Sequence, residues 1–330
     1  MKIAVIGGGA WGTTLANLLA KKGVDATLWV REQQVLAEIR STGRNAWYLP
    51  DVVLHETLEV TSDPEAALKD AACFLFVVPC QFYRNMLIQF REMLPKKPLI
   101  VCANKGIEVG SLKTVSQVTA EELGSLKPRF AMLSGPSFAH EVSKELPTAV
   151  ALGCDDKKAG KEVQEMLATD YFRVYTNGDV RGVELGGAVK NVIAIAAGIA
   201  DGLGYGHDAR AALITRGLAE MSRLGIAMGA KAKTFMGLAG MGDLVLTCTG
   251  DLSRNRQVGL RLGKGQTLME ILGEMKSVAE GVKTTEAVHA LGQKHKVDMP
   301  ITDQVFKVLY EGKDPNAAVR ELMTRSLKDE

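Results

Sequence analysis

Cysteine is scarce in this 330-residue chain, and none of the five cysteines lies in a C-x-x-C spacing. Such a scattered, odd-numbered set forms no disulfide framework and is typical of a compartment where thiols stay reduced. We therefore interpret them as small buried hydrophobic residues. They are Cys73, Cys80, Cys102, Cys154 and Cys248. The five histidines show no zinc-type spacing with one another or with cysteine, so we predict no metal site.

A long apolar run and a charge imbalance are also missing. The apolar stretch Asn191–Ala200 is far shorter than the roughly 20 residues of a spanning helix, so we predict no membrane span. The start, Met1–Gly12, contains three consecutive glycines and is unlike a signal peptide, so we expect a cytoplasmic protein. The net charge is +2, with 40 basic and 38 acidic residues, which argues against a nucleic-acid partner.

The length of the chain and a change in its pattern of apolar residues predict two domains. Short apolar runs alternate with helical stretches up to about residue 180, which indicates a doubly wound parallel sheet of the Rossmann type. The expected strands are 2–6, 26–30, 74–78, 99–103, 129–133, 148–152 and 172–175. After that point apolar residues recur at helical spacing. We predict a nucleotide-binding domain over residues 1–180 and a helical substrate-binding and catalytic domain over residues 181–330.

The segment Gly7-x-Gly9-x-x-Gly12 joins the first expected strand to the first expected helix. In this context the pattern is the dinucleotide-binding fingerprint. Gly7 permits the tight turn, Gly9 lets the backbone approach a pyrophosphate, and Gly12 lets the helix pack closely on the strand. Arg31 ends the second strand and suits the extra phosphate of NADP(H), whereas the adjacent Glu32 could hold the ribose of NAD(H). We predict NADP(H), or the use of both cofactors.

Four later segments carry candidate chemistry. Lys105 follows a strand end, where ligands of such sheets bind. Lys190 lies in a helical segment of small residues and is a candidate for proton transfer. Asp243 is predicted at a constrained turn between glycines, although a simple capping role is common for Asp. Ser253, Arg254 and Asn255 offer a hydroxyl, a guanidinium and an amide that suit a phosphate, and Arg256 is taken as surface charge.

Together these segments resemble the bacterial-type NAD(P)-dependent glycerol-3-phosphate dehydrogenases. The resemblance runs in collinear order from residue 1 to beyond residue 310. The segments that carry it are 7–13 (GGGAWGT), 104–106 (NKG), 134–139 (SGPSFA), 186–191 (GGAVKN), 215–217 (TRG), 242–244 (GDL) and 253–256 (SRNR).

The resemblance implies reversible hydride transfer between NAD(P)H and dihydroxyacetone phosphate, giving sn-glycerol 3-phosphate for phospholipid synthesis, in a cytoplasmic homodimer. It makes Lys190 the proton donor and acceptor, places Asp243 and Asn191 in the polar network around the reacting oxygen, and makes Lys105 a catalytic residue that touches both substrate and cofactor. It places the substrate on Lys105, Gly135, Ser137, Lys190, Asp243, Ser253, Arg254 and Asn255. It places the cofactor on Ala10, Trp11, Arg31, Lys105, Ala139, Arg254, Val278 and Glu280, besides the three fingerprint glycines.

Two residues depart from the family pattern. Gly8 stands where Ala is frequent, which should loosen the loop slightly, and His207 stands where Asn is usual. His140 is an alternative proton carrier, because histidine titrates near neutrality. Two other functions stay open from the residues alone: a related β-hydroxyacid dehydrogenase that binds a carboxylate, and a protein that senses NADP without turnover.

Overall fold

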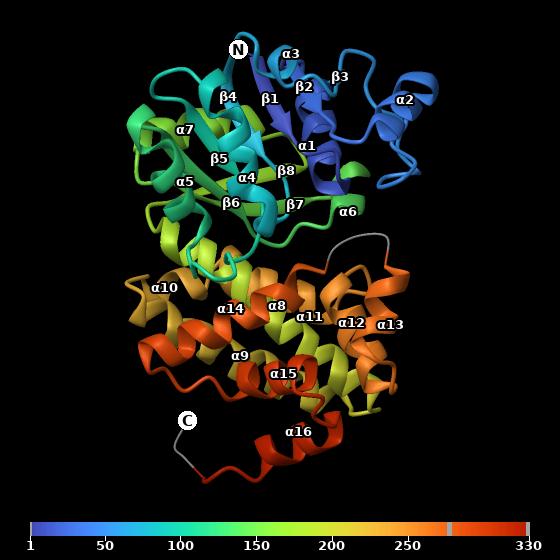
Figure 1. Cartoon of the computed structure of the whole chain (residues 1–330), viewed down its shortest axis with the longest axis vertical. Helices are drawn as coiled ribbons and strands as arrows, with labels where there is room; N and C mark the ends of the chain where they lie inside the picture. The colour runs from blue at the N-terminus through green and yellow to red at the C-terminus, as the bar shows by residue number, and fades with distance from the viewer. Residues whose placement is uncertain (1, 276–278, 328–330) are drawn as a thin grey trace. The chain divides into compact units, whose positions relative to one another are not determined.

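The computed structural model describes residues 2–275 and 279–327, and its first part is built on an eight-stranded sheet (Figure 1). The strand order is β3-β2-β1-β4-β5-β6-β7-β8, and the pairs are parallel apart from β6 with β7. The strands are β1 Lys2–Ile6, β2 Ala26–Trp29, β3 Glu59–Thr61, β4 Ala71–Phe76, β5 Leu99–Cys102, β6 Arg129–Ser134, β7 Thr148–Gly153 and β8 Phe172–Asn177. The predicted Rossmann-type sheet is thus confirmed, and β3 is the strand that the sequence analysis did not predict.

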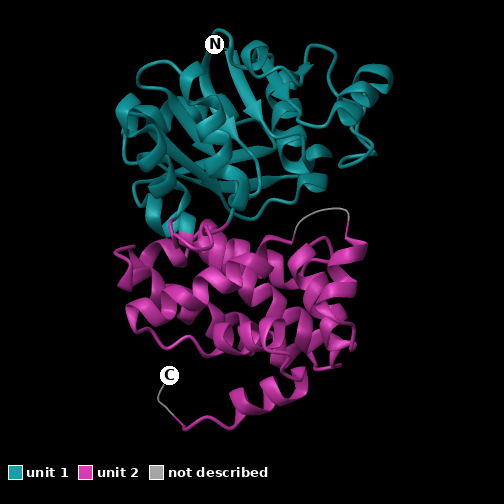
Figure 2. Ribbon diagram, viewed as in Figure 1, with its two compact units in different colours: residues 1–105, 114–184 teal, residues 106–113, 185–330 magenta. Residues whose placement is uncertain are grey.

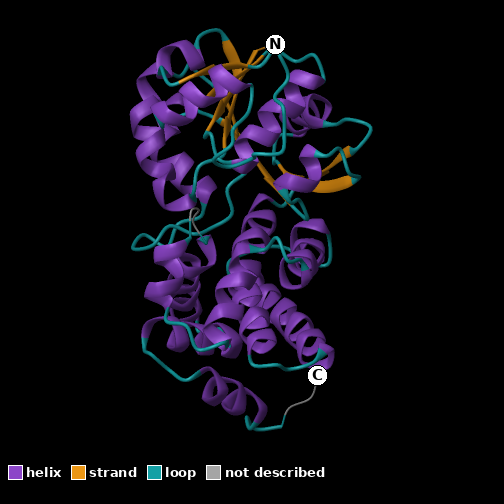
Figure 3. Ribbon diagram, turned by 90° about the vertical axis from the view of Figure 1, so that its right-hand side faces the viewer, coloured by secondary structure: helices purple, strands orange, loops and turns teal. Residues whose placement is uncertain are grey.

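Helices cover both faces of the sheet (Figure 3). On one face, α1 (Ala10–Lys21) and α7 (Lys157–Leu167) bury apolar side chains in one core with alternate residues of the strands. On the other face, Phe90 of α4 (Cys80–Phe90) packs edge to face against Trp29 and Phe76. The remaining helices here are α2 Gln33–Thr42, α3 Pro64–Leu68, α5 Val115–Leu123 and α6 Ala139–Ser143. Burial on both faces explains why the strands are continuous apolar runs.

The chain divides into two compact units, coloured separately in Figure 2. Unit 1 comprises residues 1–105 and 114–184, and unit 2 comprises residues 106–113 and 185–330. The division falls inside α8 (Val180–Gly202), a few residues after the expected boundary at residue 180. The short excursion at 106–113 has no counterpart in the sequence-based domain assignment.

Unit 2 is helical, as predicted. After α8 it contains α9 His207–Ala227, α10 Ala232–Phe235, the π-helical turn η3 Leu238–Gly242, α11 Asp243–Thr249, α12 Arg254–Gly263, α13 Leu268–Glu274, α14 Glu280–His295, α15 Pro300–Tyr310 and α16 Pro315–Met323. By length and composition α8 could cross a membrane, but it is wholly buried within the structure, as expected for a core helix.

Helix α8 contacts its neighbours backbone to backbone. A Cβ atom added at Gly186 would lie 2.4 Å from the Ala239 carbonyl oxygen of η3. A Cβ at Gly198 would lie 2.0 Å from the Arg256 carbonyl oxygen, and one at Gly259 of α12 would lie 2.0 Å from the Ile195 carbonyl oxygen. The small residues of this helix therefore allow close packing of η3 and α12 against it.

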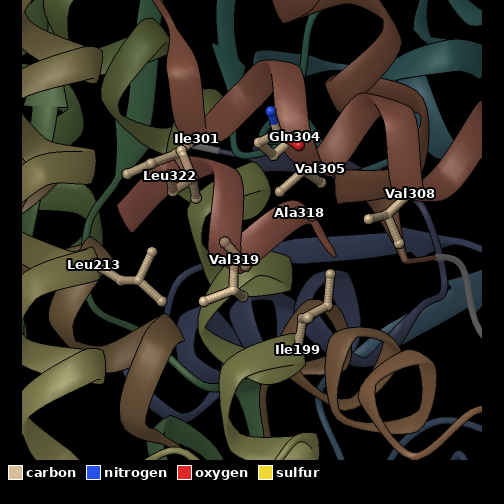
Figure 4. A pocket seen from close by; sticks show the side chains of 10 residues that line it. Ile199, Leu213, Ile301, Gln304, Val305, Val308, Ala318, Val319 and Leu322 are labelled. Atoms are coloured by element: carbon tan, nitrogen blue, oxygen red, sulfur yellow. The ribbon is translucent and has the colours of Figure 1, made fainter. Parts of the chain in front are cut away.

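A small apolar cavity of about 30 Å³ lies where α16 packs on α8, α9 and α15 (Figure 4). Its lining is almost entirely aliphatic, including Ile199, Leu213, Val305 and Leu322. A void of this size could admit one water molecule, but it lacks the several polar partners that a water needs. The cavity therefore offers mainly apolar contacts, with Gln304 as its polar lining residue.

Two buried glutamates tie helices together, one in each unit. Glu184 accepts hydrogen bonds from the backbone N–H and the hydroxyl of Ser116, both at 2.6 Å. Glu220 accepts bonds from the N–H of Ile301 at 2.5 Å, and from the N–H and hydroxyl of Thr302. Burial raises the pKa of each carboxyl group from 4.5 to about 7, although the hydrogen bonds oppose that rise.

The pKa shift of Glu184 predicts a pH-dependent stability. A raised pKa contributes stability that is fully present below about pH 4.5 and is lost as the pH rises through about 7. A Glu184→Gln variant keeps the contact, because its amide can donate to the Ser116 hydroxyl. We expect its melting temperature to rise relative to the wild type between pH 5 and pH 8.

Glu220→Gln is the matched contrast. Its new amide N–H groups would face the Thr302 N–H, which can only donate, so we expect a loss of about 1–3 kcal/mol below pH 5. This loss should shrink as the pH rises through about 7, because the wild-type Glu220 carboxyl also loses stability there. Thermal unfolding of the two variants across this pH range checks both expectations. A difference between Glu184→Gln and wild type that does not change with pH would contradict the assignment.

Candidate active site

The fingerprint loop of unit 1 has the geometry that its glycines predict. Gly7 has φ +126°, and a Cβ there would lie 2.6 Å from the Val77 carbonyl oxygen. A Cβ at Gly12 would lie 1.9 Å from the Gly7 carbonyl oxygen, whereas one at Gly9 would meet nothing within 4 Å. The loop is therefore closed on the protein side and open at Gly9, the residue predicted to face a pyrophosphate.

Gly8 corrects one expectation of the sequence analysis. A Cβ at this position would lie 2.8 Å from both Cγ atoms of Val30, which follows β2. Glycine thus removes a steric conflict with Val30 in this chain, rather than loosening the loop. The next residues, Ala10 and Trp11, begin α1, and the Trp11 ring packs at a tilt against Phe172 with 6.3 Å between centroids.

Arg31 and Glu32, the two candidates for the cofactor ribose, pair with each other. Arg31 Nη2 lies 2.6 Å from Glu32 Oε1, and the Arg31 side chain is 67% exposed. An exposed pair of this kind contributes at most about 1 kcal/mol, so either side chain can be released to a ligand at small cost. The geometry leaves both cofactors compatible with this strand end.

Three predicted substrate residues of unit 1 meet at one carbonyl group. Lys105 Nζ donates to the Gly135 carbonyl oxygen at 2.9 Å, and the Ser137 hydroxyl donates to the same oxygen at 3.0 Å. Gly135 has φ +129°, and a Cβ there would press on the Val150 backbone at 3.1 Å. The turn after β6 therefore holds Lys105 at the carboxyl ends of β5 and β6.

Two buried polar side chains beside this turn lack partners. The amide of Asn104 and the hydroxyl of Ser134 are buried and have no hydrogen-bond partner within the described residues. Unsatisfied groups of this kind are rare in native structures and indicate a missing water or ligand. Because they lie at the strand ends where nucleotides bind, together with the open loop at Gly9, unit 1 fits a dinucleotide.

Ala139 and His140 begin α6, next to this turn. The Ala139 carbonyl oxygen accepts a hydrogen bond from the Thr14 hydroxyl of α1 at 3.3 Å. His140 is partly exposed, and its Nε2 lies 3.6 Å from Asp51. A partly solvated histidine beside a surface carboxylate has no feature that favours it as the proton carrier.

In unit 2, Lys190 lies in a buried polar cluster. Its Nζ lies 2.8 Å from Asp243 Oδ1 and 2.7 Å from Thr247 Oγ1. The Thr247 hydroxyl is 2.6 Å from the Asp243 carbonyl oxygen and 3.2 Å from Asp243 Oδ1. All three residues are buried. Asp243 is the first residue of α11, directly after η3, so it lies in a continuous helical segment and not at the expected constrained turn.

The sequence analysis did not identify Thr247. The signal that could have found it is its spacing, because Asp243 and Thr247 are four residues apart and share one face of a helix. Their partner Lys190 comes from α8, which approaches η3 closely at Gly186. The small residues near Lys190 thus bring the carboxylate to the ammonium group.

A second chain of amides links α8 to α12 and α14. Asn255 Nδ2 donates to Asn191 Oδ1 at 2.8 Å, and the Gly281 N–H donates to Asn255 Oδ1 at 2.9 Å. Asn255 therefore has one amide hydrogen beyond those used in this chain. Glu280, a predicted cofactor residue, begins α14, and the predicted Val278 lies outside the described residues.

The predicted phosphate residues lie at the start of α12. The Ser253 hydroxyl oxygen caps the helix by accepting from the Arg256 N–H at 3.2 Å. Arg254 is exposed beside it. Helix N-termini attract anions, and an Arg in the first turn adds a forked donor.

Arg256 corrects the sequence analysis, which took it as surface charge. It is buried, and it donates from Nε to Asp201 Oδ2 and from Nη1 to Asp251, both at 2.8 Å. Asp201 also accepts two bonds from Arg210. The 253–256 segment did not reveal these ion pairs because both aspartates lie outside it.

No group of three metal-binding side chains occurs among residues 2–275 and 279–327. The five cysteines are free and buried, as interpreted from the sequence. Burial raises the pKa of Cys73 and of Cys248 to about 12, so these thiols stay protonated. His207 begins α9 and is exposed.

The sheet of unit 1 opens with a dinucleotide-type glycine loop, and unit 2 holds a buried lysine with a carboxylate and a hydroxyl. This combination defines a nicotinamide-dependent dehydrogenase as the class of protein. Two family models match the chain: the NAD-dependent glycerol-3-phosphate dehydrogenase N-terminus over residues 2–160, and the C-terminus of the same family over residues 179–320. The chain belongs to this family.

Individual relatives agree with the family models. Curated proteins named glycerol-3-phosphate dehydrogenase [NAD(P)+] from Solidesulfovibrio magneticus and Maridesulfovibrio salexigens are 68% and 62% identical over the full length of both chains. A crystal structure of glycerol-3-phosphate dehydrogenase from Coxiella burnetii superimposes with a TM-score of 0.95 at 44% identity, covering 98% of this chain and 99% of that one. These matches favour the glycerol-3-phosphate dehydrogenase family over the β-hydroxyacid dehydrogenase and the non-catalytic sensor.

The Arg256 ion pairs predict a stability effect in unit 2. Arg256→Met removes charge-assisted hydrogen bonds to Asp201 and Asp251, whereas Asp201 keeps its pair with Arg210, so we expect a loss of about 1.5–3 kcal/mol in the free energy of unfolding. Arg261→Met is the control on the same helix, because its partner Glu274 is exposed and the expected loss is below about 1 kcal/mol. Equal losses of unfolding free energy in the two variants would contradict a larger contribution of the Arg256 ion pairs to stability.

Proposed function

We propose that this chain catalyses the reversible NAD(P)-dependent reduction of dihydroxyacetone phosphate to sn-glycerol 3-phosphate, which supplies glycerophospholipid synthesis. Family membership supports the reaction. The single observation that carries the mechanism is the buried cluster of Lys190, Asp243 and Thr247.

Lys190 is proposed as the proton donor in the reducing direction. A nicotinamide dinucleotide held at the loop of Gly7, Gly9 and Gly12 would supply the hydride for C2 of the substrate. The C2 oxygen then becomes an alkoxide and takes a proton from the Lys190 ammonium group, and in the reverse direction the amine takes that proton back. The Asp243 carboxylate and the Thr247 hydroxyl fix the Nζ atom between them, so the proton is held at a defined place.

Lys105 is proposed to stabilise the negative charge on the same oxygen, as its position at the strand ends supports. Ser253 and Arg254, with the remaining N–H of Asn255, are proposed to bind the phosphate group. The first turn of α12 presents its own N–H groups to the same anion. Asn191 holds Asn255 in place from α8.

The reaction itself is tested by the loss of reduced-nicotinamide absorbance. We expect the wild-type protein to oxidise NADPH with dihydroxyacetone phosphate and to be nearly inactive with unphosphorylated dihydroxyacetone. Turnover that does not require the phosphate, or binding of cofactor without turnover, would contradict the proposed substrate.

Lys190→Ala tests the proton step. General acid–base groups typically contribute about 100- to 10,000-fold, so we expect kcat to fall in that range while NADPH affinity stays within about twofold. Single-turnover kinetics and cofactor fluorescence give the two quantities. The control is Lys264→Ala, an exposed lysine at the end of α12. A folded Lys190→Ala protein with less than a tenfold loss would remove the proposed role.

Arg31→Ala tests the cofactor preference. If Arg31 binds the 2′-phosphate, the variant loses about tenfold or more in affinity for NADPH and little for NADH, because that contact is charge-assisted. Titration of both cofactors measures the ratio, with Arg40→Ala of α2 as a nearby exposed control. An unchanged NADPH to NADH ratio would leave Arg31 as surface charge.

A cytoplasmic homodimer is proposed on the family resemblance. Light scattering of the purified chain tests the dimer: a mass near twice 35.5 kDa is expected, and a monomer over the working concentration range would contradict it.

A further inference from the structure

Asn45 is a fully buried polar residue that no part of the proposed mechanism uses. It lies in the segment between α2 and β3, far in sequence from the fingerprint loop. Its side chain nevertheless reaches that loop: Nδ2 donates to the Gly8 carbonyl oxygen and to Thr13 Oγ1, both at 2.8 Å. The Thr13 hydroxyl also donates to the Gly8 oxygen, at 3.3 Å.

The orientation of the Asn45 amide follows from its partners. The Gly8 carbonyl oxygen can only accept, so the NH₂ end must face it. At the other end, Asn45 Oδ1 accepts the N–H of Tyr48 at 3.3 Å, and the Asn45 carbonyl oxygen accepts the N–H of Leu49 at 2.7 Å. The side chain is thus held from both sides and cannot turn without losing a buried hydrogen bond.

Fixing the Gly8 carbonyl also fixes the next N–H group. The peptide unit is planar and trans, so the Gly9 N–H points opposite to the Gly8 carbonyl. Asn45 holds that carbonyl toward the protein interior, and the Gly9 N–H therefore points away from Asn45. A Cβ added at Gly9 would meet nothing within 4 Å, and the Gly9 N–H has no acceptor within the described residues.

We infer that Asn45 is a positioning residue for the dinucleotide: it orients the Gly8–Gly9 peptide so that the Gly9 N–H is presented to the pyrophosphate. The inference rests on the proposed cofactor binding. It assigns no contact between Asn45 and the cofactor itself, because the side chain is buried on the protein side of the loop.

The chain offers a matched control at Asn17 of α1. Asn17 is also buried and also holds the same segment, since its Oδ1 accepts the His55 N–H at 2.7 Å. None of the hydrogen bonds that Asn17 makes within the described residues reaches the fingerprint loop. Losing Asn17 should therefore weaken the anchorage of the segment without turning the Gly8–Gly9 peptide.

The experiment compares Asn45→Ala with Asn17→Ala by direct binding of NADPH and NADH, followed by fluorescence without substrate. A hydrogen bond to a charged group accounts for roughly a 10- to 100-fold change in Kd. We expect Asn45→Ala to weaken NADPH and NADH by the same factor within this range, because the pyrophosphate is common to both. Asn17→Ala should change neither Kd by more than about threefold.

A second readout separates positioning from general damage. At saturating cofactor, the KM of Asn45→Ala for dihydroxyacetone phosphate should match that of the wild type. If Asn45→Ala does not fold, Asn45→Asp decides on the same scale, since it keeps the size of the side chain but replaces the donor to the Gly8 carbonyl oxygen with an acceptor.

The outcomes are distinct for the inference and for the proposed function. Wild-type protein that binds neither cofactor would overturn the function. Wild-type binding with an unchanged Kd in Asn45→Ala, or equal losses in Asn45→Ala and Asn17→Ala, would overturn the inference alone.

Discussion

Close backbone packing against helix α8 is the constraint on which the helical unit depends. Where Gly186 faces the Ala239 carbonyl oxygen, any side chain would push η3 away, and Asp243 begins the helix that follows directly. The contacts at Gly198 and Gly259 hold α12 in the same manner. These contacts allow Lys190 to meet Asp243 and Asn191 to meet Asn255. The distances between these polar side chains therefore follow from the glycines at a few positions.

Unit 1, which is built on the sheet, also depends on close backbone packing at glycines. Its glycines let backbone approach backbone at Gly7 and Gly12, and leave a bare peptide edge at Gly9. A bare loop could adopt several conformations, since glycine restricts the backbone least. The buried amide of Asn45 removes that freedom by holding one carbonyl group. In both units, glycines allow two backbone segments to approach closely, and a few buried polar side chains then fix the orientation of the groups at that contact.

Much of this could be predicted from the sequence because the signals are local. The apolar runs located seven of the eight strands, and the fingerprint required only a strand, a turn and a helix. The strand β3 was missed because Glu59–Thr61 has only three residues, none of them fully buried, which is too short for an alternating pattern or an apolar run to be recognised. Arg256, Thr247 and Asn45 were misjudged or missed for another reason: their partners Asp201, Lys190 and Gly8 are distant in sequence, and no periodicity reports such contacts. The excursion at 106–113 is a property of tertiary packing alone.

The most direct test of this account is the single-turnover rate of hydride transfer in Gly186→Ala, with Gly273→Ala as the control, since a Cβ at Gly273 meets nothing within 4 Å. The account predicts that Gly186→Ala still binds NADPH, because the fingerprint loop is untouched. It also predicts that the rate falls by about 100-fold or more, because Asp243 is displaced from Lys190. A folded Gly186→Ala protein that reduces dihydroxyacetone phosphate at the wild-type rate would contradict the claim that packing at α8 sets the geometry of proton transfer.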